Sequence, residues 1–253
     1  MTHHEPLETV VVGLPSASAS VTYSILDVLA SVGRDWELLH GAPSRPSSFA
    51  SRHLSLDGKP YTEVNGRRIT PEGRLNEATS PGLVIIPDLH LDPTRPLPDH
   101  FAPIANWLRK THSNGAIITS VCSGAMLLAE TGLLDGEMAT THWGYSDAIM
   151  QRHPGINLRR ERILVPAGEG HRLITAGGAS AWADLLLYLI TRVAGADEAR
   201  RIAKVYLIEP HAQGQMCYAS LSTGRQHDDQ IVGEAQAWAA MNYEHPSPVS
   251  AMA

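Results

Sequence analysis

The sequence predicts an α/β protein with a doubly wound, mostly parallel sheet and helices on both of its faces. Two observations favour this fold class. Short β-branched, apolar runs alternate with helical patterns over about residues 7–212, which is the order that parallel strands with crossover helices require. Most of these runs are apolar at every position, as strands covered on both faces are.

The expected elements follow from the spacing of apolar residues and from the turn residues between them. Ile25, Val28 and Leu29 fall at helical spacing in the first helix, which Ser20 can cap and Gly33 can end. In chain order, strands are expected over residues 9–13, 36–40, 83–87, 115–121, 158–165 and 173–175, and helices over residues 21–32, 97–112, 125–131, 143–153, 180–193 and 197–209.

Residues 41–73 depart from this alternation. Short alternating pieces lie around residues 53–56 and Val64, and the pairs Asp57-Gly58 and Asn65-Gly66 are typical of hairpin turns. We therefore expect a small antiparallel excursion in this part of the chain.

The composition is that of an ordinary globular chain. It has 253 residues, of which 43% are hydrophobic and 18% charged, and it contains no apolar run of about 18 residues that could span a membrane. Residues 1–8 lack the apolar core of a signal peptide. Cys122 and Cys217 are too few for a disulfide framework, so we expect a cytoplasmic setting. The net charge of −6 argues against a DNA-binding surface spread over the whole chain.

The segment Ser120-Val121-Cys122-Ser123-Gly124 lies between an apolar run and a helix of small residues. A strand, a tight turn and a helix in this order form a nucleophile elbow, which holds a reactive side chain at the end of a central strand. Gly124 allows close packing at the turn. The first amides of the following helix favour a thiolate over a thiol at Cys122. The alternative is a small residue retained for packing.

Residues 87–98 form a proline- and aspartate-rich loop after a predicted central strand. Loops at the carboxyl ends of parallel strands hold ligands in open α/β sheets, so Asp88 and His90 are candidate ligand contacts. The alternative for His90 is a solvent-exposed loop histidine. Asp88 and Asp92 could meet a cationic group of a ligand, or they could form turns.

Thirteen histidines raise the question of a metal site. None shows a ligand spacing such as two histidines four residues apart on a helix, so we expect no metal and no other cofactor. His142, just past a strand, could orient the thiol of Cys122 or could be a structural histidine bonded to backbone. Arg159, Arg160 and Arg162 are expected on the solvated face of a strand.

The C-terminal part differs from the α/β domain. Residues 216–227 have the composition of a linker, and residues 228–243 have the amphipathic pattern of a helix. The chain stops soon after Pro248, where another helix could begin, which favours truncation. We therefore expect one domain over residues 1–222 and, over residues 223–253, a linker and the first helix of a truncated helix-turn-helix domain.

Several motifs resemble the ThiJ/PfpI superfamily, the class I glutamine amidotransferase-like group. They lie between about residues 8 and 222 and comprise Val121-Cys122-Ser123-Gly124-Ala125, Gly132-Leu133-Leu134, Ala139-Thr140-Thr141-His142-Trp143 and Ile174-Thr175-Ala176-Gly177-Gly178-Ala179. The resemblance implies a flavodoxin-like fold and a homodimer. Two branches share these motifs: isonitrile hydratase-like enzymes and the amidase-like sensor domain of AraC-type transcriptional regulators. Pro210-His211 and the helix after it are similar to the junction that precedes the DNA-binding part of the regulators.

In the enzymes of this superfamily, a Glu or Asp at the start of the first helix shares a proton with the cysteine. The resemblance aligns Val21 with that position, and valine cannot take part in proton transfer. Asp27 lies further along the helix, on another face. This departure favours a sensor over an enzyme.

Functions from different classes therefore remain open. The first is the sensing of a small metabolite by an AraC-type regulator, in which DNA is read only by a C-terminal domain missing from this chain. Its ligand-binding residues would surround Cys122: Val21, Asp88, His90, Ser123 and Gly124. The alternative is an isonitrile hydratase-like or related enzyme in which Cys122 attacks and His142 or a water manages protons. A third possibility is a dimeric scaffold with an inert cysteine.

Overall fold

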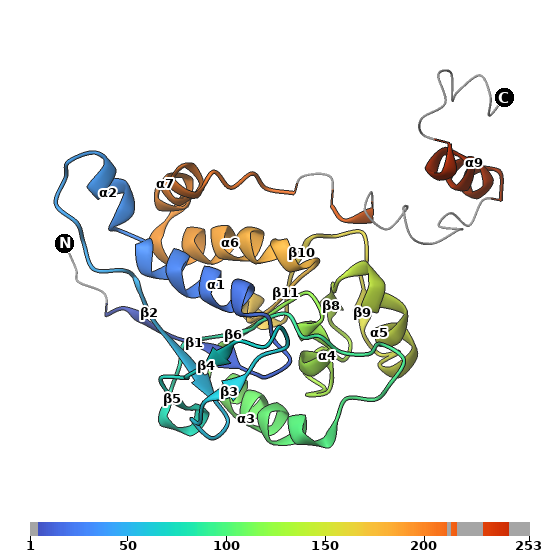
Figure 1. Ribbon diagram of the computed structural model, residues 1–253, viewed down its shortest axis with the longest axis horizontal. Coiled ribbons are helices and arrows are strands. Elements are labelled where there is room, and N and C mark those ends of the chain that lie inside the picture. Colours follow the sequence, from blue (N-terminus) through green and yellow to red (C-terminus); the bar gives the residue numbers. More distant parts are fainter. Residues whose placement is uncertain (1–4, 212–213, 217–229, 243–253) are drawn as a thin grey trace.

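A seven-stranded sheet forms the centre of the protein in the computed structural model, which describes residues 5–211, 214–216 and 230–242 (Figure 1). Its strands are β1 (Leu7–Gly13), β2 (Phe49–Ser55), β5 (Gly73–Arg74), β6 (Leu83–Ile86), β7 (Ile117–Val121), β10 (Leu164–Ala167) and β11 (Leu173–Ala176). The strand order is β10-β11-β7-β6-β1-β2-β5, and each neighbouring pair is parallel except β10 with β11. The predicted fold class is confirmed.

Helices cover both faces of this sheet. They are α1 (Ala19–Ser31), α3 (Ala102–Ser113), α4 (Gly124–Ala129), α5 (Ser146–Arg152), α6 (Trp182–Ala194) and α7 (Ala196–Tyr206). α1, α6 and α7 share one apolar cluster with Val11 of β1, whereas α3 and α4 share another with Val10 and Val12. Because successive strand residues point to opposite faces, the two clusters lie on opposite sides of the sheet. Figure 1 shows α1 and α6 side by side.

Short 3-10 turns also occur in the described part of the chain. These turns are η1 (Leu75–Glu77), η2 (Asp99–Phe101), η3 (Trp143–Tyr145), η4 (Glu169–His171) and η5 (Ala179–Ala181). Three of them lead directly into α3, α5 and α6. The helices predicted from residues 97 and 143 therefore begin as regular helices only at Ala102 and Ser146.

The direction in which strands are added reverses at β1. β2 is added on one side of β1, and β6 and β7 are added on the other. Ligands in such sheets bind outside the carboxyl ends of the strands beside this reversal. β6 ends at Ile86 and β7 ends at Val121, immediately before the loop of residues 87–98 and the turn at Cys122. The topology thus brings both candidate segments to one edge of the sheet.

The prediction of a strand over residues 36–40 is wrong, because a short helix, α2 (Asp35–Leu39), lies there. The rings of Trp36 and His40, four residues apart, stack with their centroids 4.0 Å apart. Glu37 is buried and pairs with Arg201 of α7 at 3.3 Å. Contacts at helical spacing therefore outweigh the strand propensity of this short run.

The antiparallel excursion predicted between residues 41 and 73 is present only in part. β2 belongs to the main sheet and pairs in parallel with β1 along its whole length. Only β3 (Tyr61–Thr62) and β4 (Arg68–Ile69) pair antiparallel, across the predicted Asn65-Gly66 turn. β2 meets the short β5 over just two residues on its outer side. Its polar, alternating sequence suits this near-edge position and is hard to distinguish from a hairpin strand.

The strand predicted over residues 158–165 is divided into two. β9 (Asn157–Leu158) pairs with β8 (Met138–Ala139) in a separate sheet, whereas β10 pairs with β11. Between them the backbone turns, and the amide of Arg162 donates to the carbonyl of Arg159 at 3.0 Å. The arginines are exposed, as expected, but they lie in a turn and not on a strand face.

Helix α9 (Gln230–Met241) confirms the helix predicted over residues 228–243. Most of the predicted linker over residues 216–227, the domain boundary after residue 222 and Cys217 lie outside the described residues. Within the described ranges, no helix is both long and apolar enough to cross a membrane.

Gly124→Ala should destabilise the fold by about 1–3 kcal/mol, because a crowded core side chain forces the surrounding structure to shift. A Cβ atom at this position would lie 2.4 Å from the carbonyl oxygen of Pro87, which is backbone and cannot swing away. Urea denaturation gives the free energy of unfolding. Gly155→Ala is the matched control, since its Cβ would have no neighbour closer than 3.7 Å. Equal losses in the two variants would contradict this account.

Candidate functional site

Cys122 lies in the tight turn between β7 and α4, as the elbow prediction requires. Its φ angle is 56°, in the left-handed region that residues other than glycine rarely adopt. Its amide donates to the carbonyl of Ala176, at the end of β11, at 3.0 Å. Strained backbone of this kind persists where the surrounding structure fixes it, often at functional sites.

Ser123 joins the elbow to the loop after β6. Its hydroxyl accepts a hydrogen bond from the amide of Leu89 at 2.8 Å and donates to the carbonyl of the same residue. Gly124 follows, and its missing side chain lets the carbonyl of Pro87 approach closely. The structure therefore places Ser123 and Gly124 at the elbow as fixed parts of its frame.

The Cys122 thiol is buried, and burial raises its pKa to about 11. Hydrogen bonds from Ser123 oppose this rise, and the negative charge of Asp88 adds to it. The amide of Ser123 lowers the pKa, as expected of the first helix amides, but burial outweighs it and the thiol has a raised pKa. α4 has only six residues, and the loss of solvation outweighs what its first amides contribute.

Asp88 supplies a buried carboxyl group beside the thiol, from the end of β6. Its Oδ2 accepts a hydrogen bond from the hydroxyl of Ser18, and its Oδ1 is buried with no hydrogen-bond partner among the described residues. Burial raises the pKa of Asp88, although the bond from Ser18 opposes this. His90 lies in the same loop with its Nε2 3.7 Å from Oδ2, and its side chain is half exposed.

Val21 occupies the first turns of α1 and is buried in the same apolar cluster as Cys122. Asp27 is exposed on the other side of this helix. The helix therefore presents an apolar side chain, and no carboxylate, towards the cluster that contains the thiol.

His142 is bonded to backbone. Its Nδ1 accepts a hydrogen bond from the amide of Gly144 at 3.1 Å, and burial lowers its pKa, so the ring is neutral at neutral pH. No hydrogen bond joins His142 to Cys122 among the residues that the structure describes. The ring packs against Trp143, with the centroids 4.8 Å apart.

Three residues of the site had no clear signal in the sequence. The hydroxyl of Tyr145 donates to the carbonyl of Leu91 at 2.9 Å, and burial raises the pKa of this tyrosine. The hydroxyl of Thr141 donates to the carbonyl of Cys122 at 2.9 Å. Ser18, which binds Asp88, is 70 residues away from it in the sequence. The segment Thr140-Thr141-His142-Trp143 offered a motif, but not these bonds.

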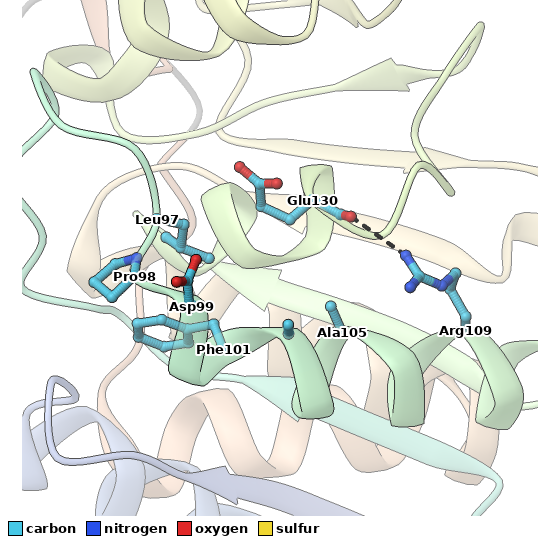
Figure 2. Close-up of a pocket in the computed structure, with 8 residues that line it drawn as sticks. Leu97, Pro98, Asp99, Phe101, Ala105, Arg109 and Glu130 are labelled. Carbon is cyan, nitrogen blue, oxygen red and sulfur yellow. Dashed lines mark hydrogen bonds between the residues drawn. The ribbon is translucent and has the colours of Figure 1, made fainter.

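The loop of residues 87–98 borders two hollows. One, of about 210 Å³, is lined by His90, Asp92 and Arg95 together with Met126 of α4. The second, of about 170 Å³, lies between η2, α3 and the end of α4 (Figure 2). Figure 2 shows Asp99 beside this second pocket, across which Arg109 donates to the carbonyl of Glu130 at 3.4 Å. Asp88 belongs to neither.

The chemistry at the elbow suits recognition by hydrogen bonding. A neutral thiol, a buried carboxyl with a spare acceptor and a phenol lie together, and no base is bonded to the thiol in the described part of the chain. The described residues also contain no group of three histidine, cysteine, aspartate or glutamate side chains that could hold a metal ion.

Alkylation of Cys122 should be slow at neutral pH and should accelerate towards pH 11, because the thiolate is the reacting form and the pKa is raised to about 11. The measurement is the rate of iodoacetamide labelling against pH in a Cys217→Ser background. Asp88→Asn removes a negative charge and should move the midpoint to lower pH. A short cysteine peptide, with a midpoint at about 8.5, is the control. A midpoint for the protein at or below that of the peptide would disprove the burial argument.

Comparison with known proteins places the chain in a family. Residues 33–192 match the DJ-1/PfpI family. The chain is 30% identical over 188 residues to the HTH-type transcriptional regulator CdhR of Pseudomonas aeruginosa, a match that covers 72% of this chain and 54% of CdhR. It is 32% identical over 97 residues to isonitrile hydratase of Pseudomonas putida, covering 38% of this chain and 40% of the enzyme. The chain thus spans about half the length of these relatives, or less.

A solved structure of an AraC family transcriptional regulator from Pseudomonas putida has the same fold. It superposes with a TM-score of 0.65 at 19% sequence identity, covering 79% of this chain and all of that one. The match over residues 33–192, together with the strand order and the elbow, identifies the chain as a member of the DJ-1/PfpI family.

Proposed function

We propose that this chain is the ligand-sensing part of an AraC-type transcriptional regulator and that a small molecule binds beside Cys122. The observation that carries the proposal is the state of the elbow: the thiol is buried with a raised pKa, and Val21 stands where superfamily enzymes are expected to have a carboxylate. The similarity to CdhR and to the AraC family structure supports the same function.

The chemistry of the ligand follows from Asp88. Its Oδ1 is a buried acceptor without a donor in the described residues, and leaving such a group unpaired is costly. A ligand that brings an N–H group, above all a cationic amine or guanidinium, would satisfy it and would hold the carboxyl ionised. His90, Ser123 and Gly124 would frame the site, and Val21 would supply an apolar wall.

In the whole regulator, residues 1–222 would form the sensor and residues 223–253 the beginning of the DNA-binding part. A homodimer in the cytoplasm would then read two half-sites, and ligand binding would change the spacing of the two DNA-binding modules. Specific DNA binding would belong to the C-terminal module, as the resemblance to the regulators implies.

A cysteine-dependent, isonitrile hydratase-like enzyme is the second candidate. The observations in its favour are the 32% identity to isonitrile hydratase and the carboxyl of Asp88, which lies close enough to Cys122 to raise the pKa of its thiol. In such an enzyme Cys122 would attack the substrate carbon, while Asp88 and His142 would have to manage protons from positions other than the start of α1.

A thermal-shift screen tests the sensing function with a panel of primary amines, guanidines, neutral amides and carboxylic acids. We expect an amine or guanidine to raise the melting temperature, since a ligand at one hundred times its Kd stabilises a protein by about 2.7 kcal/mol. Asp88→Asn should weaken that ligand about tenfold or more, because a charge-assisted hydrogen bond is lost. Asp57→Asn, a change at an exposed aspartate outside the loop of residues 87–98, is the control. Equal affinity in the two variants, or stabilisation by the acids alone, would contradict the assignment of Asp88.

Turnover of isonitriles separates the two functions. The wild-type chain and Cys122→Ala should both show only the background rate, with the Pseudomonas putida hydratase as the positive control for the assay. Turnover by the wild type that disappears in Cys122→Ala would establish the enzyme and overturn the sensor.

A further inference from the structure

Gln215 is a polar side chain buried inside the protein, on the segment that leaves the α/β domain. Its exposed fraction is 2%. Its Nε2 lies within hydrogen-bonding distance of four oxygens: the carbonyls of Thr141 at 2.7 Å, Arg160 at 3.0 Å and Arg162 at 3.2 Å, and the Thr140 hydroxyl at 3.3 Å. An amide nitrogen has two protons to donate, so these oxygens fully occupy it.

Two further contacts hold the same segment, which we call the exit segment (residues 208–211 and 214–216). Asp184 of α6 accepts hydrogen bonds from the amide and the Nδ1 of His211, at 2.9 and 2.7 Å. Gly214 has a φ of 69°, and its backbone passes so close to Glu161 that a Cβ would lie 2.4 Å from the Glu161 carbonyl oxygen. The exit segment is thus fixed on the domain before the chain continues to α9.

The same amide of Gln215 is connected to the elbow through one residue. The carbonyl of Thr141 accepts from Gln215, and the hydroxyl of Thr141 donates to the carbonyl of Cys122 at 2.9 Å. Gln215 also lies against the end of β11, where a Cβ on Gly177 would come within 3.0 Å of its amide atoms. A change in the backbone at Cys122 therefore reaches Gln215 across two hydrogen bonds.

The contact is not fully satisfied. The Oε1 of Gln215 is buried without a hydrogen-bond partner among the described residues. Burying this acceptor unpaired costs free energy, so the docked position of the side chain is less stable than its donor bonds alone would make it. An incompletely satisfied buried group suits a contact that has to be released.

We propose that Gln215 is a positioning residue that couples the elbow to the exit segment, so that occupation of the site beside Cys122 and docking of the chain towards α9 influence each other. This inference rests on the proposed sensing function. A bound small molecule would act on the chain after the sensor through the hydrogen bonds that join Cys122, Thr141 and Gln215. Because coupling between two sites is reciprocal, it must be measurable from either end.

The experiment uses covalent modification of Cys122 in place of a ligand, so that its failure is distinct from a failure to find a ligand. In a Cys217→Ser background, Gln215→Ala should increase the rate at which DTNB (a thiol reagent) reacts with Cys122 at least fivefold, because the Thr141 contact at the elbow loosens. Gln151→Ala, an exposed glutamine on α5, is the matched control and should leave the rate unchanged.

The reverse measurement is hydrogen–deuterium exchange of the exit segment. Alkylation of Cys122 with iodoacetamide should increase exchange in the exit segment severalfold, while exchange in β1 stays as it was. Gln215→Ala that loosens the exit segment but leaves the Cys122 rate unchanged, or alkylation without any effect on the exit segment, would reduce Gln215 to a local anchor and overturn the proposal.

A second pair of variants applies if Gln215→Ala does not fold. Thr141→Val keeps the shape of the side chain and removes the donor to Cys122, whereas Thr141→Ser keeps the hydroxyl. The valine variant should increase exchange in the exit segment, and the serine variant should not. Equal exchange in the two would also overturn the coupling.

Discussion

The two hydrogen bonds between Ser123 and the backbone of Leu89 are the constraint on which the site depends. They join the turn after β7 to the loop after β6. Because Gly124 has no side chain, the Pro87 carbonyl packs directly against its backbone. Together they hold Cys122 in its left-handed conformation and bring Asp88 beside it. The buried hydroxyl of Ser123 and the backbone of the loop after β6 therefore set the position of the thiol.

Burial decides the chemistry of that thiol. The amides at the start of α4 favour a negative charge, but the removal of solvent and the nearby Asp88 favour the neutral form, and the pKa rises to about 11. Val21 adds apolar surface to the cluster that contains the thiol. The result is an uncharged cysteine next to a carboxyl whose Oδ1 has no hydrogen-bond partner among the described residues, which agrees with the proposed role in binding a ligand.

Much of the fold could be predicted from the sequence because it depends on local pattern. The all-apolar runs predicted the central strands. The small residues around Cys122 predicted the elbow and the close packing at Gly124. The strand assigned to residues 36–40 failed because a ring stack and the pairing of Glu37 with α7 exist only in the folded chain. β2 was assigned to a hairpin because polar and apolar residues alternate in a near-edge strand as they do in a hairpin strand, although β2 pairs in parallel with β1. The bonds made by Ser18, Thr141 and Gln215 join distant parts of the sequence, and no spacing reveals them.

The proposed sensing function requires that the elbow cysteine is held neutral. The most direct measurement is the ultraviolet absorbance of the thiolate in the Cys217→Ser chain during a pH titration of the folded protein, with Cys122→Ser as the blank. We expect no thiolate signal at neutral pH and a midpoint well above that of a free cysteine. A thiolate already present at neutral pH would contradict it and would return Cys122 to the role of a nucleophile.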